Sequence, residues 1–124
     1  MGVQGLALLA LLCAAGTEPR NASHALVAGR RRLSDQYAQL AKLTAGDAAA
    51  GDYFGSSVAI DGDTVVVGAY GKDSYTGSAY VFRTTDGGAT YGQVAKLTAS
   101  DAAGDDYFGK SVAIDGTTVV VGAY

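Results

Sequence analysis

The hydrophobic and polar positions of this chain follow a pattern that returns after a fixed interval. Residues 54–70 read FGSSVAIDGDTVVVGAY, and residues 108–124 read FGKSVAIDGTTVVVGAY. The interval is 108 − 54 = 54 residues, and residues 41–70 match residues 95–124 at 25 of 30 positions. A repeat of this length is typical of stacked supersecondary units. The chain therefore contains copies of one structural unit.

Within one period the pattern predicts short strands joined by turns. Two runs rich in β-branched residues, 56–61 and 64–69, flank an Asp-Gly link at Gly62, which is a strong hairpin signal. The three consecutive valines of the second run indicate a strand covered on both faces. Alternation over 78–85 and a turn signal before 91–98 complete the period. One period thus predicts four antiparallel strands.

Glycines and aromatic residues mark the places where these strands meet their neighbours. A strand at 36–44 shares the ending AKLT with the strand at 91–98, so an outermost strand precedes the first full period. At Phe54, as in the second copy, an aromatic residue enters the core and the following glycine permits a sharp turn. Gly68 has no Cβ, so we expect a neighbouring backbone to approach it closely.

The first residues have the composition of a targeting segment. An apolar run at 6–15 is followed by small residues, and its length suits a signal peptide but not the roughly 20 residues of a membrane span. We expect a signal peptide at 1–16, a secreted or extracellular location and no transmembrane span.

Residues 17–34 show no clear period and are interpreted as a basic linker or pro-segment, before a repeat region at 35–124. Asn21 begins an Asn-Ala-Ser acceptor for N-glycosylation, which applies to a secreted glycoprotein. Arg30, Arg31 and Arg32 form either a processing site or a solvated stretch of linker.

Charge and composition narrow the function classes. The net charge of −3 divides into +3 over residues 17–32 and −6 from residue 33 onward, and an acidic repeat region argues against a nucleic-acid partner. Cys13 is the only cysteine and His24 the only histidine. No nucleophile–base pair is visible, so we expect no enzyme activity and no catalytic residues.

Both copies carry an aromatic-Gly pair and then a Gly-Ala pair: Phe54, Gly55, Gly68 and Ala69 in the first, and Phe108, Gly109, Gly122 and Ala123 in the second. This pattern resembles FG-GAP repeats, the blades of integrin α-subunit-like β-propellers, although Tyr70 and Tyr124 replace the final Pro. The resemblance implies an all-β fold of four-stranded antiparallel blades. About one full blade and partial neighbours are present, so further blades or other chains must complete the propeller.

The resemblance does not extend to a metal site. Family members often hold calcium in an Asp-rich hairpin loop, but here the turns shrink to Asp61-Gly62-Asp63 and Asp115-Gly116-Thr117, too short to supply six to eight oxygens. We expect no cofactor and no metal ligand. The acids of the other loops are interpreted as solvated, with weak cation binding as the alternative: Asp47, Asp52, Asp101, Asp105 and Asp106.

Residues 84–91, TTDGGATY, resemble the Asp-box of sialidase-like propellers, with Asp86 and Gly88 in place and Tyr91 replacing Trp. In that family the Asp-box is a folding element between the outer strands, which implies a structural role here.

These observations favour a non-catalytic secreted or cell-surface module for recognition or adhesion, part of a larger propeller. It is expected to bind a protein or glycan through the loops at 45–51 and 71–77. Two alternatives stay open: a purely structural repeat remnant, and an accessory module of an enzyme whose catalytic domain is absent.

Overall fold

The computed structural model describes residues 25–29 and 37–124, which form three antiparallel sheets and one short helical turn. The predicted all-β fold is therefore confirmed. The elements are β1 (Ala25–Gly29), β2 (Ala38–Leu43), β3 (Phe54–Asp61), β4 (Thr64–Ala69), α1 (Lys72–Tyr75), β5 (Ser78–Arg83), β6 (Gly92–Leu97), β7 (Ser111–Asp115) and β8 (Thr118–Gly122).

The central sheet is one complete blade, with the strand order β3-β4-β5-β6. All four strands coincide with those expected from the sequence to within two residues at each end. Asp61 pairs with Thr64 across the β3–β4 turn, and Gly62 at its first central position has a φ of 56°. A two-residue hairpin with glycine at this position matches the right-handed twist of its strands.

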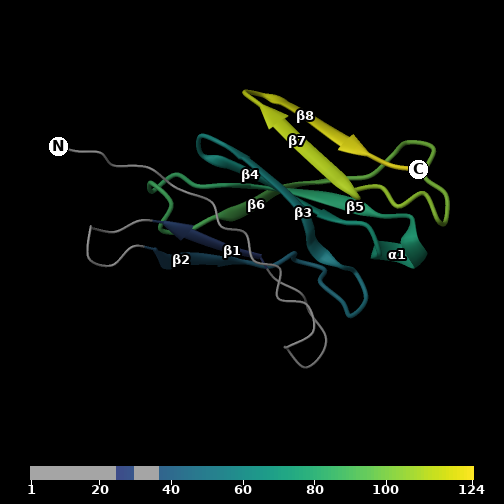
Figure 1. The fold of residues 1–124 in the computed structure, drawn as a ribbon, viewed down its shortest axis with the longest axis horizontal. Helices are drawn as coiled ribbons and strands as arrows, with labels where there is room; N and C mark the ends of the chain where they lie inside the picture. The colour runs from purple at the N-terminus through teal and green to yellow at the C-terminus, as the bar shows by residue number, and fades with distance from the viewer. Residues whose placement is uncertain (1–24, 30–36) are drawn as a thin grey trace.

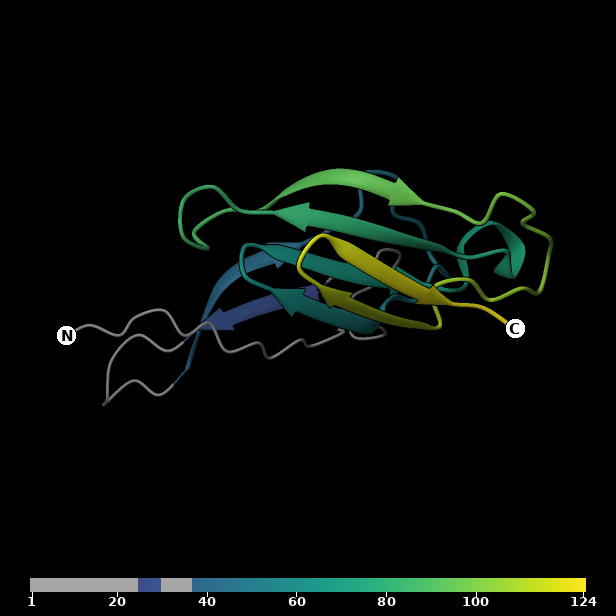
Figure 2. The same ribbon diagram turned by 90° about the horizontal axis from the view of Figure 1, so that it is seen from above.

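The two other sheets are half-blades that cover opposite faces of the central sheet. Figure 1 shows the β1–β2 pair below the central sheet and the β7–β8 pair above it. The view from above places β7–β8 over β3 and β4, in agreement with their contacts (Figure 2). The three sheets are therefore stacked layers, as adjacent blades of a propeller are.

The core lies between the central sheet and β1–β2. Val65, Val67 and Tyr80 of the central sheet are fully buried there, together with Val27 of β1 and Leu43 of β2. The ring of Phe54 meets those of Tyr80 and Phe82 edge to face, with centroids 5.6 and 6.0 Å apart. Such edge-to-face pairs are a favoured aromatic geometry, so the aromatic-Gly pair anchors the start of the blade.

Strand β1 is an element that the sequence analysis did not predict. Residues 17–34 were interpreted as a linker, yet Ala25–Gly29 pairs with β2. Its register repeats that of β5 and β6 with an offset of 54: Ala25 lies opposite Leu43 as Ala79 lies opposite Leu97. The register shift after Val27 likewise recurs after Val81. The β1–β2 pair is thus the outer half of a preceding blade.

Candidate binding surface

The two loops predicted to bind a ligand lie side by side at one end of the blade. The backbone N–H of Gly71 donates to the carbonyl of Asp52 over 3.0 Å. Lys72 reaches from α1 into the other loop, where its Nζ donates to the Asp47 carbonyl at 2.7 Å and to Asp52 Oδ2 at 3.2 Å. Residues 45–51 and 71–77 therefore form one continuous surface.

A network of charged and hydroxyl groups fixes these loops to the blade. Asp47 accepts hydrogen bonds of 2.7 Å from both the Tyr80 hydroxyl and Lys96 Nζ. Asp52 is buried and also accepts the backbone N–H of Ala49 at 2.9 Å. The interpretation of Asp47 and Asp52 as solvated acids is wrong, because folding brings lysines from two distant elements onto them.

The pKa values of this network follow from its geometry. Partial burial of Asp47 raises its pKa, but hydrogen bonds from Lys96 and Tyr80 and the charge of Lys72 outweigh this and lower the pKa to about 2. For Tyr80, burial and the hydrogen bond to Asp47 raise the pKa. Burial lowers the pKa of Lys72, but its bond to Asp52 and the nearby carboxylates raise it overall. The network is therefore charged at neutral pH.

Five tyrosines gather at the end of the molecule where α1 and the C-terminus lie (Figure 1). Two pairs are repeat equivalents: the rings of Tyr53 and Tyr70 stack with centroids 4.8 Å apart, and those of Tyr107 and Tyr124 stack at 5.6 Å. Tyr75 lies between the pairs, 6.3 Å from Tyr53 and 5.5 Å from Tyr107. We call these five residues the tyrosine cluster.

A lysine completes the tyrosine cluster. Lys110 Nζ lies 4.3 Å from the centroid of the Tyr70 ring and 5.6 Å from those of Tyr107 and Tyr124. These distances are within the range of cation–π attraction. A hydrogen bond with Tyr124 raises the pKa of Lys110, so its charge persists at neutral pH. The equivalent residue of the first copy is Ser56, so this cation distinguishes the two copies.

The backbone of the tyrosine cluster occupies a region that side chains rarely adopt. Tyr53, Tyr75 and Tyr107 have φ values of 54°, 66° and 53°. Hydrogen bonds between the half-blade and the loop hold part of this conformation, since Tyr107 N–H donates to the Tyr75 carbonyl at 2.8 Å. Positive φ at a non-glycine residue costs on the order of 1 kcal/mol or more, and such strain is often found at functional sites.

The residues of the aromatic-Gly and Gly-Ala pairs lie between blades, away from the tyrosine cluster. A Cβ at Gly68 would overlap the carbonyl of Gly109, and a Cβ at Gly109 would overlap the carbonyl of Ser78. Gly109 also has a φ of 95°. The structure thus shows the close backbone approach expected at Gly68. The remaining motif residues are Phe54 and Ala69, which are buried, and Gly55, Phe108, Gly122 and Ala123, which are more accessible.

The Asp-box-like turn is closed by its own side chains. Asp86 Oδ1 accepts the backbone N–H of Thr90 at 2.9 Å, and Thr84 Oγ1 accepts the N–H of Gly88 at 2.9 Å. Hydrogen bonds from Thr90 and Thr84 lower the pKa of Asp86 to about 2. The Asp86 carboxylate is occupied by the turn, which fits the structural role implied by the resemblance.

The short hairpin turns contact each other between blades. Asp61 Oδ2 accepts the backbone N–H of Gly116 at 2.5 Å. Within the described residues no group of three or more His, Cys, Asp or Glu side chains is placed to hold a metal ion. The absence of a cofactor stays a prediction.

Several expected features lie outside the described residues. They are the signal peptide at 1–16, the acceptor Asn21, and Arg30, Arg31 and Arg32. In the part of the chain that the structure describes, no helix has the length and apolar character needed to cross a membrane.

The tyrosine cluster itself was missed by the sequence analysis. A signal was present, because Tyr53 and Tyr70 recur at Tyr107 and Tyr124 with the same interval of 54 residues. Only the stacking of blades shows that Tyr75, whose neighbours in sequence are polar, joins the two pairs.

Comparison with known families identifies the repeat. The sequence profile of the FG-GAP repeat matches residues 37–82 and 91–124, which is more than half of the chain. The two matched segments correspond to the two copies, and the residues between them contain the Asp-box-like turn. No curated protein matches the chain.

Proposed function

The chain belongs to the FG-GAP repeat family, and from that premise we propose that it is a secreted or cell-surface recognition module. It binds a protein or glycan ligand through the tyrosine cluster and the adjoining loops at 45–51 and 71–77. FG-GAP repeats form β-propeller blades and are typical of extracellular proteins.

The observation that carries this proposal is the concentration of accessible tyrosines on strained backbone. Tyr75 is 38 % exposed and Tyr124 is 76 % exposed, although both rings contact other aromatic rings. Tyrosine is enriched at recognition surfaces because it offers a large, rigid contact area with a polar tip. The ion pairs of Lys72 with Asp47 and Asp52 hold the loops in place and so reduce the ordering cost of binding.

Recognition without catalysis fits the available side chains. The described residues contain neither histidine nor cysteine. The carboxylates of Asp47, Asp52 and Asp86 are engaged by lysines, hydroxyls and backbone N–H groups. General acid–base or nucleophilic catalysis needs a base within hydrogen-bond reach of the reacting group, and these carboxylates already serve the fold.

A binding comparison tests the function. The purified chain is applied to a glycan array and to extracellular protein fractions, together with Tyr75→Ala, Tyr124→Ala and the control Tyr37→Ala. Tyr37 is 56 % exposed and lies outside the tyrosine cluster. We expect a ligand whose affinity falls at least about tenfold in the two cluster variants and not in the control. Equal binding by all three variants contradicts the proposed surface.

The same variants address the structural alternative. If no glycan or protein is bound while Tyr75→Ala and Tyr124→Ala lower the melting temperature, the tyrosine cluster serves to join blades and the recognition role is wrong. A secreting host tests the location: the mature chain should begin near Thr17, and glycosidase should shift its mobility unless Asn21 is replaced by Gln. A chain retained in cells with residues 1–16 intact contradicts secretion.

A further inference from the structure

The two inner hairpins of this chain have nearly the same sequence but different surroundings. Val66 of β4 is fully buried, whereas its equivalent Val120 of β8 is 62 % exposed. Val66 lies between Ala59 and Val81 in the sheet, on the face that β7 covers. Val120 has the equivalent of Ala59 beside it, in Ala113, but no equivalent of Val81 among the described residues.

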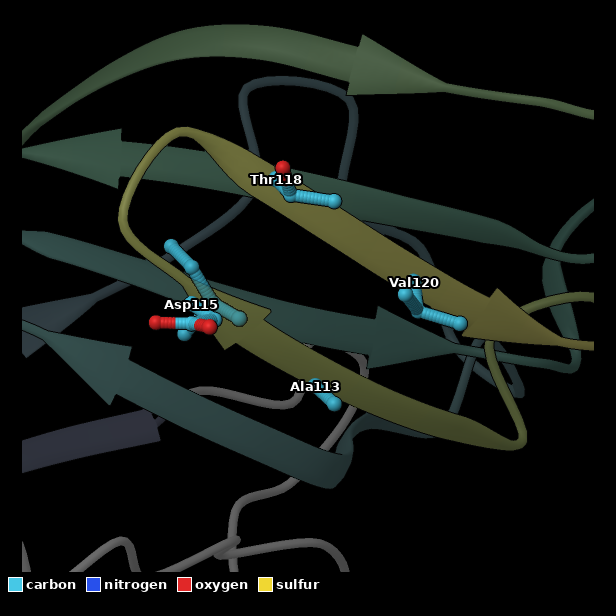
Figure 3. Close-up of a pocket in the computed structure, with 5 residues that line it drawn as sticks. Ala113, Asp115, Thr118 and Val120 are labelled. Atoms are coloured by element: carbon cyan, nitrogen blue, oxygen red, sulfur yellow. The ribbon is translucent and has the colours of Figure 1, made fainter.

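The open side of this hairpin is both an edge and a face. Strand β4 pairs with β3 on one side and β5 on the other, whereas β8 pairs, within the described residues, only with β7. The outward face of the hairpin holds a hollow of about 310 Å³, shown in Figure 3, in which Ala113, Thr118 and Val120 lie on one surface. An unpaired strand edge with an apolar face readily accepts another strand.

The missing half of this blade is present elsewhere in the same chain. The β1–β2 pair repeats the register of β5–β6, including its irregularity, but has no inner hairpin of its own among the described residues. We propose that β8 of one copy pairs with β1 of a second copy, so that two half-blades form one complete four-stranded blade.

The register of this pairing follows from the complete blade. Val66 lies opposite Val81, so Val120 of one copy lies opposite Val27 of the next. Thr64 lies opposite Arg83, so Thr118 lies opposite Gly29. The strands are antiparallel, as β4 and β5 are, and each residue of β8 meets the partner that its 54-residue equivalent already has.

A second contact forms between the faces of neighbouring copies. Val58 and Ile60 are half-buried on the face of the central sheet that carries β1–β2. Their equivalents in the second hairpin, Val112 and Ile114, face the preceding blade. In the assembly Val58 and Ile60 of one copy therefore cover Val120 of the other, and apolar surface on both is removed from water.

The interface joins different surfaces of the two copies, so it is heterologous and closes into a ring when the rotation between copies allows. Each copy contributes one complete blade and two halves, equal to two blades. A propeller contains about four to eight blades, which corresponds to about two to four copies. With 12.5 kDa for each chain, the expected mass is about 25 to 50 kDa.

Light scattering after size exclusion tests the proposal, with the chain loaded at about 1 to 100 µM, a range that spans ordinary affinities. We compare the unmodified chain with Val120→Lys and Thr117→Lys. Both add one positive charge to the same hairpin, but Thr117 corresponds to Asp63, which stays exposed in the complete blade. We expect defined assemblies for the chain and Thr117→Lys, and at least about a tenfold loss of association for Val120→Lys.

A monomer at all concentrations overturns the proposal, and so does assembly that Val120→Lys leaves unchanged or that yields only polydisperse aggregates. A cross-linking experiment tests the register directly, using Cys13→Ser with Val27→Cys and Val120→Cys. Directly opposite Cβ atoms on paired strands are about 4.5 to 5.5 Å apart, close enough for a disulfide after a small adjustment. We expect covalent multimers on a non-reducing gel. Their absence from assembled protein, or their equal formation when Thr117→Cys replaces Val120→Cys, contradicts the pairing.

Discussion

The hydroxyl of Ser57 donates a 2.7 Å hydrogen bond to the carbonyl of Gly109, and this bond joins two blades at the point where their backbones are closest. The same carbonyl lies where a Cβ of Gly68 would stand. Blade stacking in this chain therefore depends on two glycines with no room for a methyl group, and on one hydroxyl that satisfies the carbonyl between them.

Gly109→Ala is expected to lower the free energy of unfolding by about 3 kcal/mol, because the new Cβ would overlap the Ser78 carbonyl and the residue would keep a φ of 95°. Urea unfolding followed by circular dichroism measures this change. Gly92→Ala is the control, since Gly92 has open space at its Cβ position and lies outside the positive-φ region. Equal stability of the two variants would show that the blades do not pack as described.

Removing the Tyr80 hydroxyl tests the network under the loops. Tyr80→Phe is expected to cost about 1 kcal/mol of stability, because a buried ring loses its 2.7 Å bond to Asp47. It should also raise the pKa of Asp47, since that bond is one cause of its low value. Urea unfolding and an NMR titration of the carboxyl carbons measure both effects. Tyr37→Phe, at an exposed ring, should change neither.

The low pKa of Asp86 predicts a loss of stability in acid. Its pKa falls from 3.8 to about 2 on folding, so its ionised form favours the native state. This contribution is complete above about pH 4 and disappears as the pH falls through about 2. Asp86→Asn should therefore be less stable than the unmodified chain at pH 7 and show a smaller loss between pH 5 and pH 2.

Thermal unfolding at several pH values checks this prediction. Asp101→Asn removes one negative charge from an exposed loop and serves as the matched control. An Asp86→Asn variant whose pH profile is the same as that of the unmodified chain would contradict the role of the carboxylate. Asp47, with a pKa of about 2, should leave a residual acid dependence in the same range.

Strand β1 can be tested as part of the folded unit. Val27 is 1 % exposed and packs with Leu43 in the core, so Val27→Ala should cost about 2 kcal/mol through lost burial and a small cavity. Val94→Ala removes the same atoms from a side chain that is 60 % exposed, and its effect should be within about 0.5 kcal/mol of zero. If chemical denaturation finds the two variants equal, residues 25–29 act as a linker.

The central blade was predictable because its signals are local. Valine runs, the Asp-Gly turn at Gly62 and the alternation that places Tyr80 and Phe82 on one face each depend on residues close in sequence. Strand β1 lacks such signals: its sequence ALVAG shares only Ala25 with the equivalent position in β5, and it contains no turn residue of a hairpin type until Gly29. Its register becomes visible only through its partner strand.

The candidate surface was predicted in part for the same reason. The loops at 45–51 and 71–77 are polar and flank strands, so their role as a surface follows from the sequence. The contacts of Lys72 with Asp47 and Asp52 span 25 and 20 residues, and nothing in the sequence pairs these groups. The tyrosine cluster needs two stacked blades to exist, so no single copy reveals it.

The constant offset of 54 residues in strand register has a consequence for how such a chain changes in length. A recombination event that removes or adds one whole period joins each strand to a partner of the same alignment, with the same bulge and the same glycine contact. Sequences of other sizes are then reached without an intermediate that has mispaired strands. The near identity of residues 41–70 and 95–124 is the condition under which such exchange is most accurate, so copy number is the property of this fold that mutation alters at the least structural cost.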